Sequence, residues 1–190
     1  MKGKTNGLLI QYLILGSYTH FYKTINERGW GYFVLSIFVI LILHDTYFYW
    51  THRLMHHPGL FKTFHRVHHQ STNPSPWASF AFHPTEAVVG GGIFLIFAFF
   101  LPVHFLAIFI FMILMTVYNV YGHLGWELYP KSWSKHWFGQ WLNTSVSHNM
   151  HHHYFKGNYG LYFTFWDKIM RTMHPEYHET YEKVSLRKQI

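Results

Sequence analysis

The sequence predicts an all-α protein, an integral-membrane helical bundle with a cytoplasmic helical cap that is rich in histidine. Hydrophobic residues make up 49% of the 190 residues and charged residues only 12%, which is about half the charge of an ordinary soluble domain. Two apolar stretches, residues 30–50 and 87–121, are long enough to enter a bilayer. Three histidine clusters lie outside these stretches, and their spacing is typical of helices.

Residues 30–50 are predicted to form a membrane-spanning helix. From Trp30 to Leu43 the chain is apolar or aromatic except at Gly31 and Ser36, and a spanning helix needs about 20 such residues. An aromatic run follows and ends at Trp50, as expected where a helix reaches the headgroups. The earlier stretch 8–22 is open to two interpretations, a short span or a helix that lies in the interface.

Residues 87–121 are predicted to form a hairpin that returns the chain to the side of the membrane it left. The stretch contains no Asp, Glu, Lys or Arg, and Pro102 divides it into two legs. A hairpin places the second and third histidine clusters on one face. Lys and Arg occur in residues 45–85 and 120–190 but not near Pro102, so the positive-inside rule predicts that this face is cytoplasmic.

Composition also limits the class of protein. The length fits a single membrane-embedded domain over residues 1–190. The chain has no cysteine, which excludes disulfides, thiolate ligands, iron–sulfur clusters and a cysteine nucleophile. The net charge is +7, and the basic residues mostly follow the apolar stretches. This position favours anionic lipid headgroups over nucleic acid as their partner.

The three histidine clusters predict a metal site. On a helix, residues three and four apart share a face, so His52 points with His56, and His65 with His68 and His69. The first cluster leaves open whether His56 or His57 joins His52. His123 adds a candidate where the hairpin leaves the membrane. The predicted ligands are His52, His56, His57, His65, His68, His69, His123, His148, His151 and His152. They outnumber the ligands of one tetrahedral zinc, so two metals are expected.

Several other side chains are expected to support these ligands. Metal-bound histidine usually donates its second ring proton to a carboxylate or a carbonyl. The supporting candidates are Asp45, His83, Glu86, Glu127 and Asp167. The pattern is also compatible with His83 as a metal ligand. For each acid, a surface position or a helix cap is as compatible with the sequence as a supporting role.

Taken together, these motifs resemble the fatty acid hydroxylase and sterol desaturase superfamily of membrane-bound, histidine-box, di-metal oxygenases. The resemblance covers roughly residues 40–175. It is carried by the segments His52–His57, Phe64–His69, Phe82–Glu86, His148–His152, Gly157–Gly160 and Phe165–Asp167. Several members of the superfamily have a further pair of ligands before the last box, where this chain has His123 and, four residues earlier, Asn119.

The resemblance implies an oxidoreductase that hydroxylates or desaturates a C–H bond of a membrane lipid. It implies two iron ions, which zinc can replace in purified protein, and molecular oxygen as co-substrate. An external cytochrome-, ferredoxin- or reductase-type electron donor is also expected, because the chain has no G-x-G-x-x-G dinucleotide motif. The alternative is a membrane metal or heme carrier without catalysis. An intramembrane zinc protease is disfavoured because no cluster reads His-Glu-x-x-His.

Overall fold

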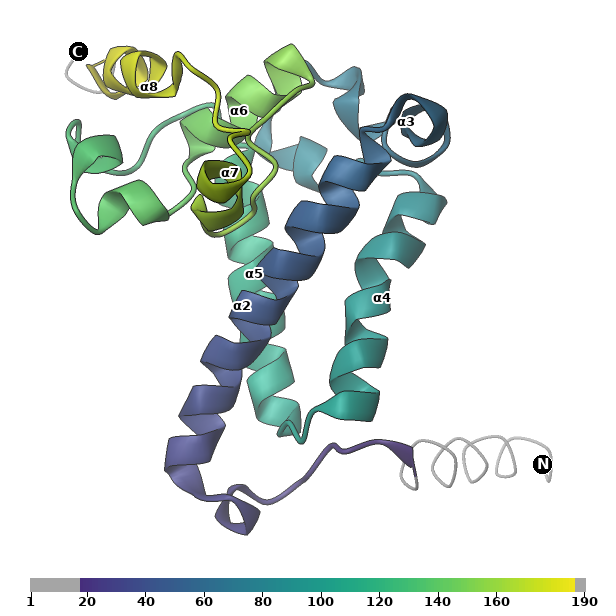
Figure 1. Ribbon diagram of the computed structural model, residues 1–190. Coiled ribbons are helices and arrows are strands. Elements are labelled where there is room, and N and C mark those ends of the chain that lie inside the picture. The colour runs from purple at the N-terminus through teal and green to yellow at the C-terminus, as the bar shows by residue number, and fades with distance from the viewer. Residues whose placement is uncertain (1–17, 187–190) are drawn as a thin grey trace. The chain divides into compact units, whose positions relative to one another are not determined.

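The computed structural model describes residues 18–186, and the regular elements in that range are helices, without a β-strand. The α-helices are α2 (Gly29–Met55), α3 (Pro58–Phe64), α4 (Pro84–Phe100), α5 (Phe105–Gly122), α6 (Ser145–Tyr154), α7 (Phe165–Ile169) and α8 (Tyr177–Leu186) (Figure 1). Short 3-10 helices are η1 (Ile25–Glu27), η2 (His68–Gln70), η3 (Pro76–Phe80), η4 (Trp133–Lys135) and η5 (Gly139–Trp141). The all-α prediction is confirmed for these residues. The prediction for residues 8–22 falls largely outside the described range.

Among residues 18–186, two helices are long and apolar enough to cross a membrane: α2 with 27 residues and α5 with 18. The apolar helix α4 is shorter, with 17 residues. It begins at Pro84, where proline's missing N–H costs no hydrogen bond. The predicted break at Pro102 is present, because residues 101–104 connect α4 to α5 (Figure 1). The His104 ring then caps α5 by accepting the Leu106 N–H at 3.0 Å.

The described residues fall into two compact units, and α2, α4 and α5 each contribute to both. Of the described residues, the first unit contains 18–42 and Gly91–Ile113. Its core holds Phe97 and Phe111, whose ring centroids are 5.6 Å apart. The Tyr32 hydroxyl donates to the Pro102 carbonyl at 2.8 Å, so the turn between α4 and α5 is hydrogen-bonded to the first half of α2.

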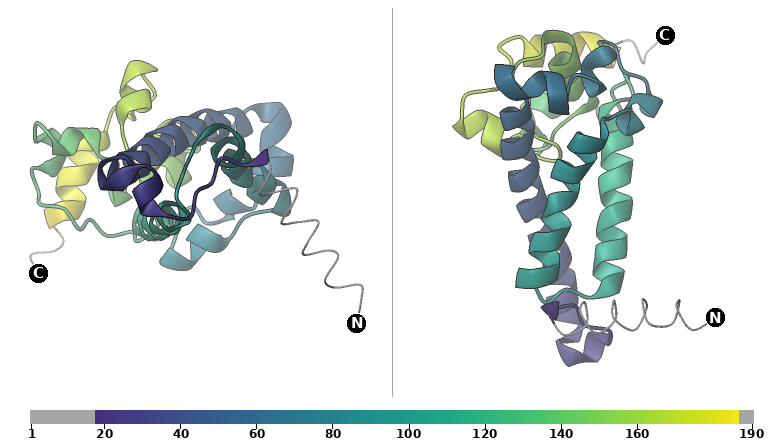
Figure 2. Two further views of the ribbon diagram at one scale, coloured as in Figure 1. Left: turned by 90° about the horizontal axis from the view of Figure 1, so that it is seen from below. Right: turned by 90° about the vertical axis from the view of Figure 1, so that its right-hand side faces the viewer.

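The second unit belongs to Leu43–Gly90 and Leu114–Ile190 and contains every predicted site residue. Helices α3, α6 and α7 gather at the C-terminal end of α2, as Figures 1 and 2 show. Val146 and Met150 of α6 pack against Tyr177 and Tyr181 of α8 in a buried apolar cluster. Thr144 caps the start of α6 by accepting the Ser147 N–H at 3.2 Å. The histidine-bearing face of α6 is therefore fixed by packing on its other side.

A tight loop follows α6 and is held by a buried carboxylate. Asp167 accepts the backbone N–H groups of Tyr159 at 2.9 Å and Gly160 at 2.8 Å, and also the Thr172 hydroxyl at 2.7 Å. Gly157 has a φ of 80°, which only glycine adopts without strain. Further along, Asp45 of α2 accepts the Tyr162 N–H at 2.8 Å. Two buried acids therefore fix the path of this loop.

Gly160→Ala is expected to destabilise the second unit, because the added methyl group would overlap the Phe163 carbonyl oxygen and lie 3.0 Å from Asp167. We expect a loss of about 2 kcal/mol, the usual size of a steric clash at a buried position. The matched control is Gly91→Ala in α4, where a methyl group meets no atom within 4 Å and alanine favours the helix. Thermal unfolding in detergent measures both changes, and equal melting temperatures would contradict the prediction.

Candidate metal centre

Nine histidines from four segments of the second unit converge in two groups. The segments are the end of α2, the stretch from the end of α3 into η2, the residue after α5, and α6. Group one contains His52, His56, His65, His69 and His151, and group two contains His68, His123, His148 and His152. Within each group the nearest ring nitrogens all lie within 4.8 Å of one another. Group two is entirely buried, whereas group one has a single half-buried member, His56.

The spacing along α6 explains how its box, His148–His152, is divided between the groups, whereas the box His65–His69 lies in the turn after α3 and in η2. Histidines four apart stay together, as in His65 with His69 and His148 with His152. The histidine that follows the first one of the box by three residues joins the opposite group, and this is His68 in one box and His151 in the other. A step of four residues turns a helix by about +40° and a step of three by about −60°. The prediction that the histidines of each box share one face is wrong for two boxes, His65–His69 and His148–His152, because each contributes to both groups.

Backbone carbonyls fix the orientation of five of the nine rings through their Nδ1 atoms. The bonds are His52 to Tyr159 (2.9 Å), His68 to Ala81 (3.2 Å), His123 to Asn119 (2.7 Å), His151 to Gly157 (2.7 Å) and His152 to Ser71 (3.0 Å). A carbonyl oxygen only accepts hydrogen bonds, so each Nδ1 carries the proton. A neutral ring with a protonated Nδ1 presents a lone pair at Nε2.

Burial keeps these rings neutral. It lowers the pKa of His68 to about 3 and that of His152 to about 2. It also lowers the pKa of His151 well below its usual value, and neighbouring histidines add to this shift. Low dielectric disfavours the imidazolium form. Near neutral pH each of these Nε2 atoms is therefore available as a ligand.

The facing Nε2 atoms fit a cation between them. His68 Nε2 and His123 Nε2 lie 3.3 Å apart, and both carry lone pairs, so no hydrogen bond joins them. His52 Nε2 and His65 Nε2 are buried without a hydrogen-bond partner among the described residues, which is costly unless a ligand satisfies them. Metal–nitrogen bonds of about 2.0–2.1 Å bring two ligand nitrogens to about 3 Å from each other. His56 and His69 meet this spacing, each with Nε2 at 3.0 Å from His151 Nε2.

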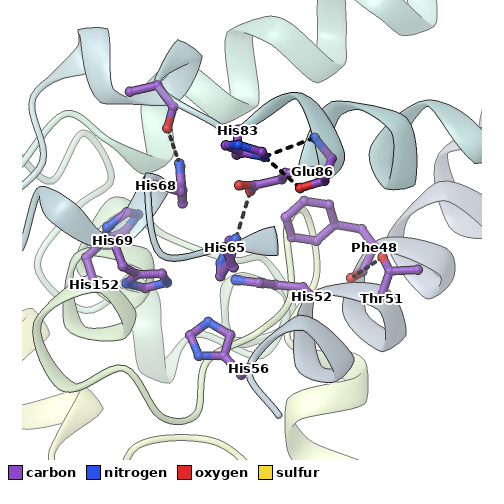
Figure 3. A network of polar contacts seen from close by, with 12 residues as sticks. Phe48, Thr51, His52, His56, His65, His68, His69, His83, Glu86 and His152 are labelled. Carbon is purple, nitrogen blue, oxygen red and sulfur yellow. Dashed lines mark hydrogen bonds and ion pairs between the residues drawn. The ribbon is translucent and has the colours of Figure 1, made fainter. Parts of the chain in front are cut away.

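Glu86 is the predicted supporting acid that contacts a grouped histidine. Its Oε1 lies 2.8 Å from His65 Nδ1, and Figure 3 shows His65 between this side chain and the rings of His52 and His56. The remaining acids support the site less directly. Asp45 and Asp167 hold the loop after α6, and Glu127 accepts the Tyr121 hydroxyl at 2.7 Å.

Two predicted histidines lie outside both groups. His57 accepts the Gly59 N–H at 3.3 Å and caps α3, so the geometry favours His56 in the first box. His83 is exposed at the start of α4, and its Nδ1 lies 2.8 Å from Thr85 Oγ1 (Figure 3). The sequence does not identify the carbonyl partners of the rings, because every residue type supplies a carbonyl and no sequence pattern marks its direction. Ligand status remains a prediction for every histidine of the site.

Comparison with known proteins assigns the family. A fatty acid hydroxylase family model matches residues 37–172. A Delta(7)-sterol 5(6)-desaturase of Gibberella zeae is 34% identical over 147 residues, which cover 77% of this chain and 44% of that protein. Lathosterol oxidase of Rattus norvegicus is 34% identical over 159 residues, which cover 83% of this chain and 52% of that protein.

The chain thus spans about half the length of these curated relatives. No solved structure gives a significant match. The family model and these relatives agree, and the chain belongs to the fatty acid hydroxylase family, within the fatty acid hydroxylase and sterol desaturase superfamily.

Proposed function

We propose that this chain is the membrane-embedded catalytic core of an oxidoreductase that uses molecular oxygen to desaturate or hydroxylate a lipid. The pair of histidine groups with converging Nε2 atoms carries this proposal. The relatives are named as sterol desaturases and lathosterol oxidases, which favours a sterol as the lipid and desaturation as the outcome.

The two groups fit two iron ions, one held by five histidines and one by four. Iron at such a centre supplies the oxygen activation that an unreactive C–H bond requires. Imidazole binds zinc as well as iron, and affinity alone does not select iron, so zinc is expected in part of any overproduced sample.

The side chains of the site have distinct tasks in this proposal. Carbonyls and Glu86 point the histidine Nε2 atoms inward. Asp167 holds the loop that provides the carbonyls of Gly157 and Tyr159. Burial of all members except His56 keeps bulk water away from the histidines. Such shielding suits chemistry in which a reactive oxidant must not be quenched.

The lipid is expected to approach from the bilayer. The site begins where α2 ends and where α5 ends, the two helices that qualify as membrane spans. A lipid that slides between helix ends avoids exposing its methylenes to water, at about 0.8 kcal/mol each. The distribution of Lys and Arg favours the cytoplasmic side for the histidine face.

A carrier role without catalysis is the second candidate, and the geometry disfavours it. Ring nitrogens only 3.0–3.3 Å apart leave no room for a heme plane between them. A carrier must also release its metal. Here nine imidazoles converge, and hydrogen bonds to carbonyls hold five of them in place, which builds a rigid, permanent site. No box supplies the His-Glu-x-x-His of a zinc protease.

Each group is expected to lose its own ion when one of its members is removed. His68→Ala should remove the group-two ion and His151→Ala the group-one ion, so that the metal content falls from about two to about one per chain and activity is lost. His153→Ala is the matched control, because this ring is exposed on the same helix as His151. Metal analysis of detergent-purified protein tests the prediction. Wild-type protein with far less than two metals per chain in repeated preparations would refute the two-ion proposal.

Glu86→Ala is expected to weaken the metal affinity of group one by about 10–100-fold, the usual effect of removing the partner of a ligand histidine. Glu86→Gln should lose less, because its amide oxygen still accepts the His65 Nδ1 proton. Glu176→Ala, at an exposed acid of the same unit, is the control. Competition with a chelator measures affinity, and a group-one ion held equally by all three variants would argue that Glu86 is only structural.

Cells that produce the active chain are expected to accumulate a sterol that lacks two hydrogens, and production should stop without oxygen. A gain of one oxygen atom from labelled molecular oxygen would instead indicate hydroxylation. Lipid mass spectrometry of cells with the wild-type chain and with His151→Ala measures this. If the two lipid profiles are identical while the wild-type chain is metal-loaded and supplied with electrons, the catalytic proposal fails and the carrier becomes the better candidate.

A further inference from the structure

A groove opens beside group one at its only half-buried histidine. The groove measures about 550 Å³ and is lined by His56, Pro58, Phe61, Lys62, Arg66 and Phe155. These residues come from the end of α2, from α3 and the turn after it, and from the end of α6. All belong to the second unit. The groove is therefore the place where the otherwise buried group one is nearest to an outside molecule.

The rim of this groove is positively charged. Lys62 and Arg66 are both exposed. Lys156, also exposed, follows Phe155 directly in the chain. Residues 46–85 and 128–166, which supply every lining residue, contain no Asp or Glu. No acid from these segments neutralises the rim, so it attracts a negatively charged partner.

Aromatic rings join the groove to the histidines. The Phe61 ring centroid lies 5.4 Å from that of His56 and 6.1 Å from that of Phe155. The Phe155 ring lies 4.9 Å from His69, the neighbouring member of group one. Phe155 is the left-handed C-cap of α6, with a φ of 60° and its backbone N–H donated to the His151 carbonyl. An apolar centre with a charged rim is the usual build of a protein docking surface.

We propose that this groove is the docking site of an acidic electron-transfer protein, whose electrons enter group one at His56. The inference rests on the proposed function, which requires electrons from outside the chain. Desaturation consumes one oxygen molecule, two electrons and two protons, removes two hydrogens from the lipid and releases two water molecules. The reduced partner is oxidised and supplies both electrons, one at a time if it is a one-electron carrier, and the solvent supplies the protons.

The test compares two reductants of iron-loaded, full-length protein in detergent. One is a reduced acidic ferredoxin, used as the protein probe, and the other is dithionite, which needs no docking surface. The variant Lys62→Glu/Arg66→Glu reverses the rim charge. The control, Lys131→Glu/Lys183→Glu, makes the same charge change at exposed positions that do not line the groove. Iron content is measured for each protein first.

For the rim variant we expect reduction by ferredoxin to be about tenfold slower at low ionic strength, with a smaller difference at high salt, since salt screens steering charges. Reduction by dithionite and the iron content should stay unchanged, and the control should behave as wild type. The inference is overturned if wild type is not reduced by ferredoxin, if the rim variant is reduced as fast as wild type, or if the control slows equally. Failure of the proposed function looks different, because then no iron is held or dithionite does not reduce it.

Discussion

Keeping nine neutral imidazoles in contact is the constraint on which the rest of the second unit depends. Each ring must turn one nitrogen toward its neighbours, and two such lone pairs, those of His68 and His123, face each other at 3.3 Å. That arrangement is unfavourable for the protein alone and favourable around a cation. The protein holds the rings in place from behind, through hydrogen bonds at Nδ1. A free ring would rotate to satisfy its own nitrogen instead.

The elements around the site can be understood as supports for those Nδ1 bonds. The loop after α6 brings the carbonyls of Gly157 and Tyr159 to His151 and His52. That loop is irregular, so its backbone N–H groups need partners of their own when buried. Asp167 provides two of those partners, which gives a physical reason for a buried acid in a chain of so little charge. The apolar packing of α6 on α8 fixes the same helix from its opposite face.

The two groups differ in their surroundings. Group two is entirely buried, and the Nδ1 atoms of three of its members bond backbone carbonyls. Group one has a carboxylate behind His65 and the half-buried His56 beside a basic groove. This asymmetry agrees with the proposal that electrons enter at group one, and it leaves group two in a fully enclosed setting.

The sequence by itself determined the helical class, the apolar helices, the break at Pro102 and nine histidines of the site. The length of an apolar stretch and the spacing of residues are local properties of the sequence, so they can be recognised without knowledge of the fold. Glu86 was one of four candidate acids, and the sequence could not single it out, because its contact with His65 depends on where α4 begins relative to the end of α3.

Only the tertiary structure decided which histidine belongs to which group. On α6 the His151 ring points about 60° to one side of the His148 ring and the His152 ring about 40° to the other, so His151 joins the opposite group. His68 is separated from His65 and His69 where the chain passes from the turn after α3 into η2. The tertiary structure also favours His56 over His57, since the turn into α3 directs the His57 ring to the Gly59 N–H. The carbonyl partners and the basic groove arise where segments distant in sequence meet, and spacing along a single helix carries no information about such meetings.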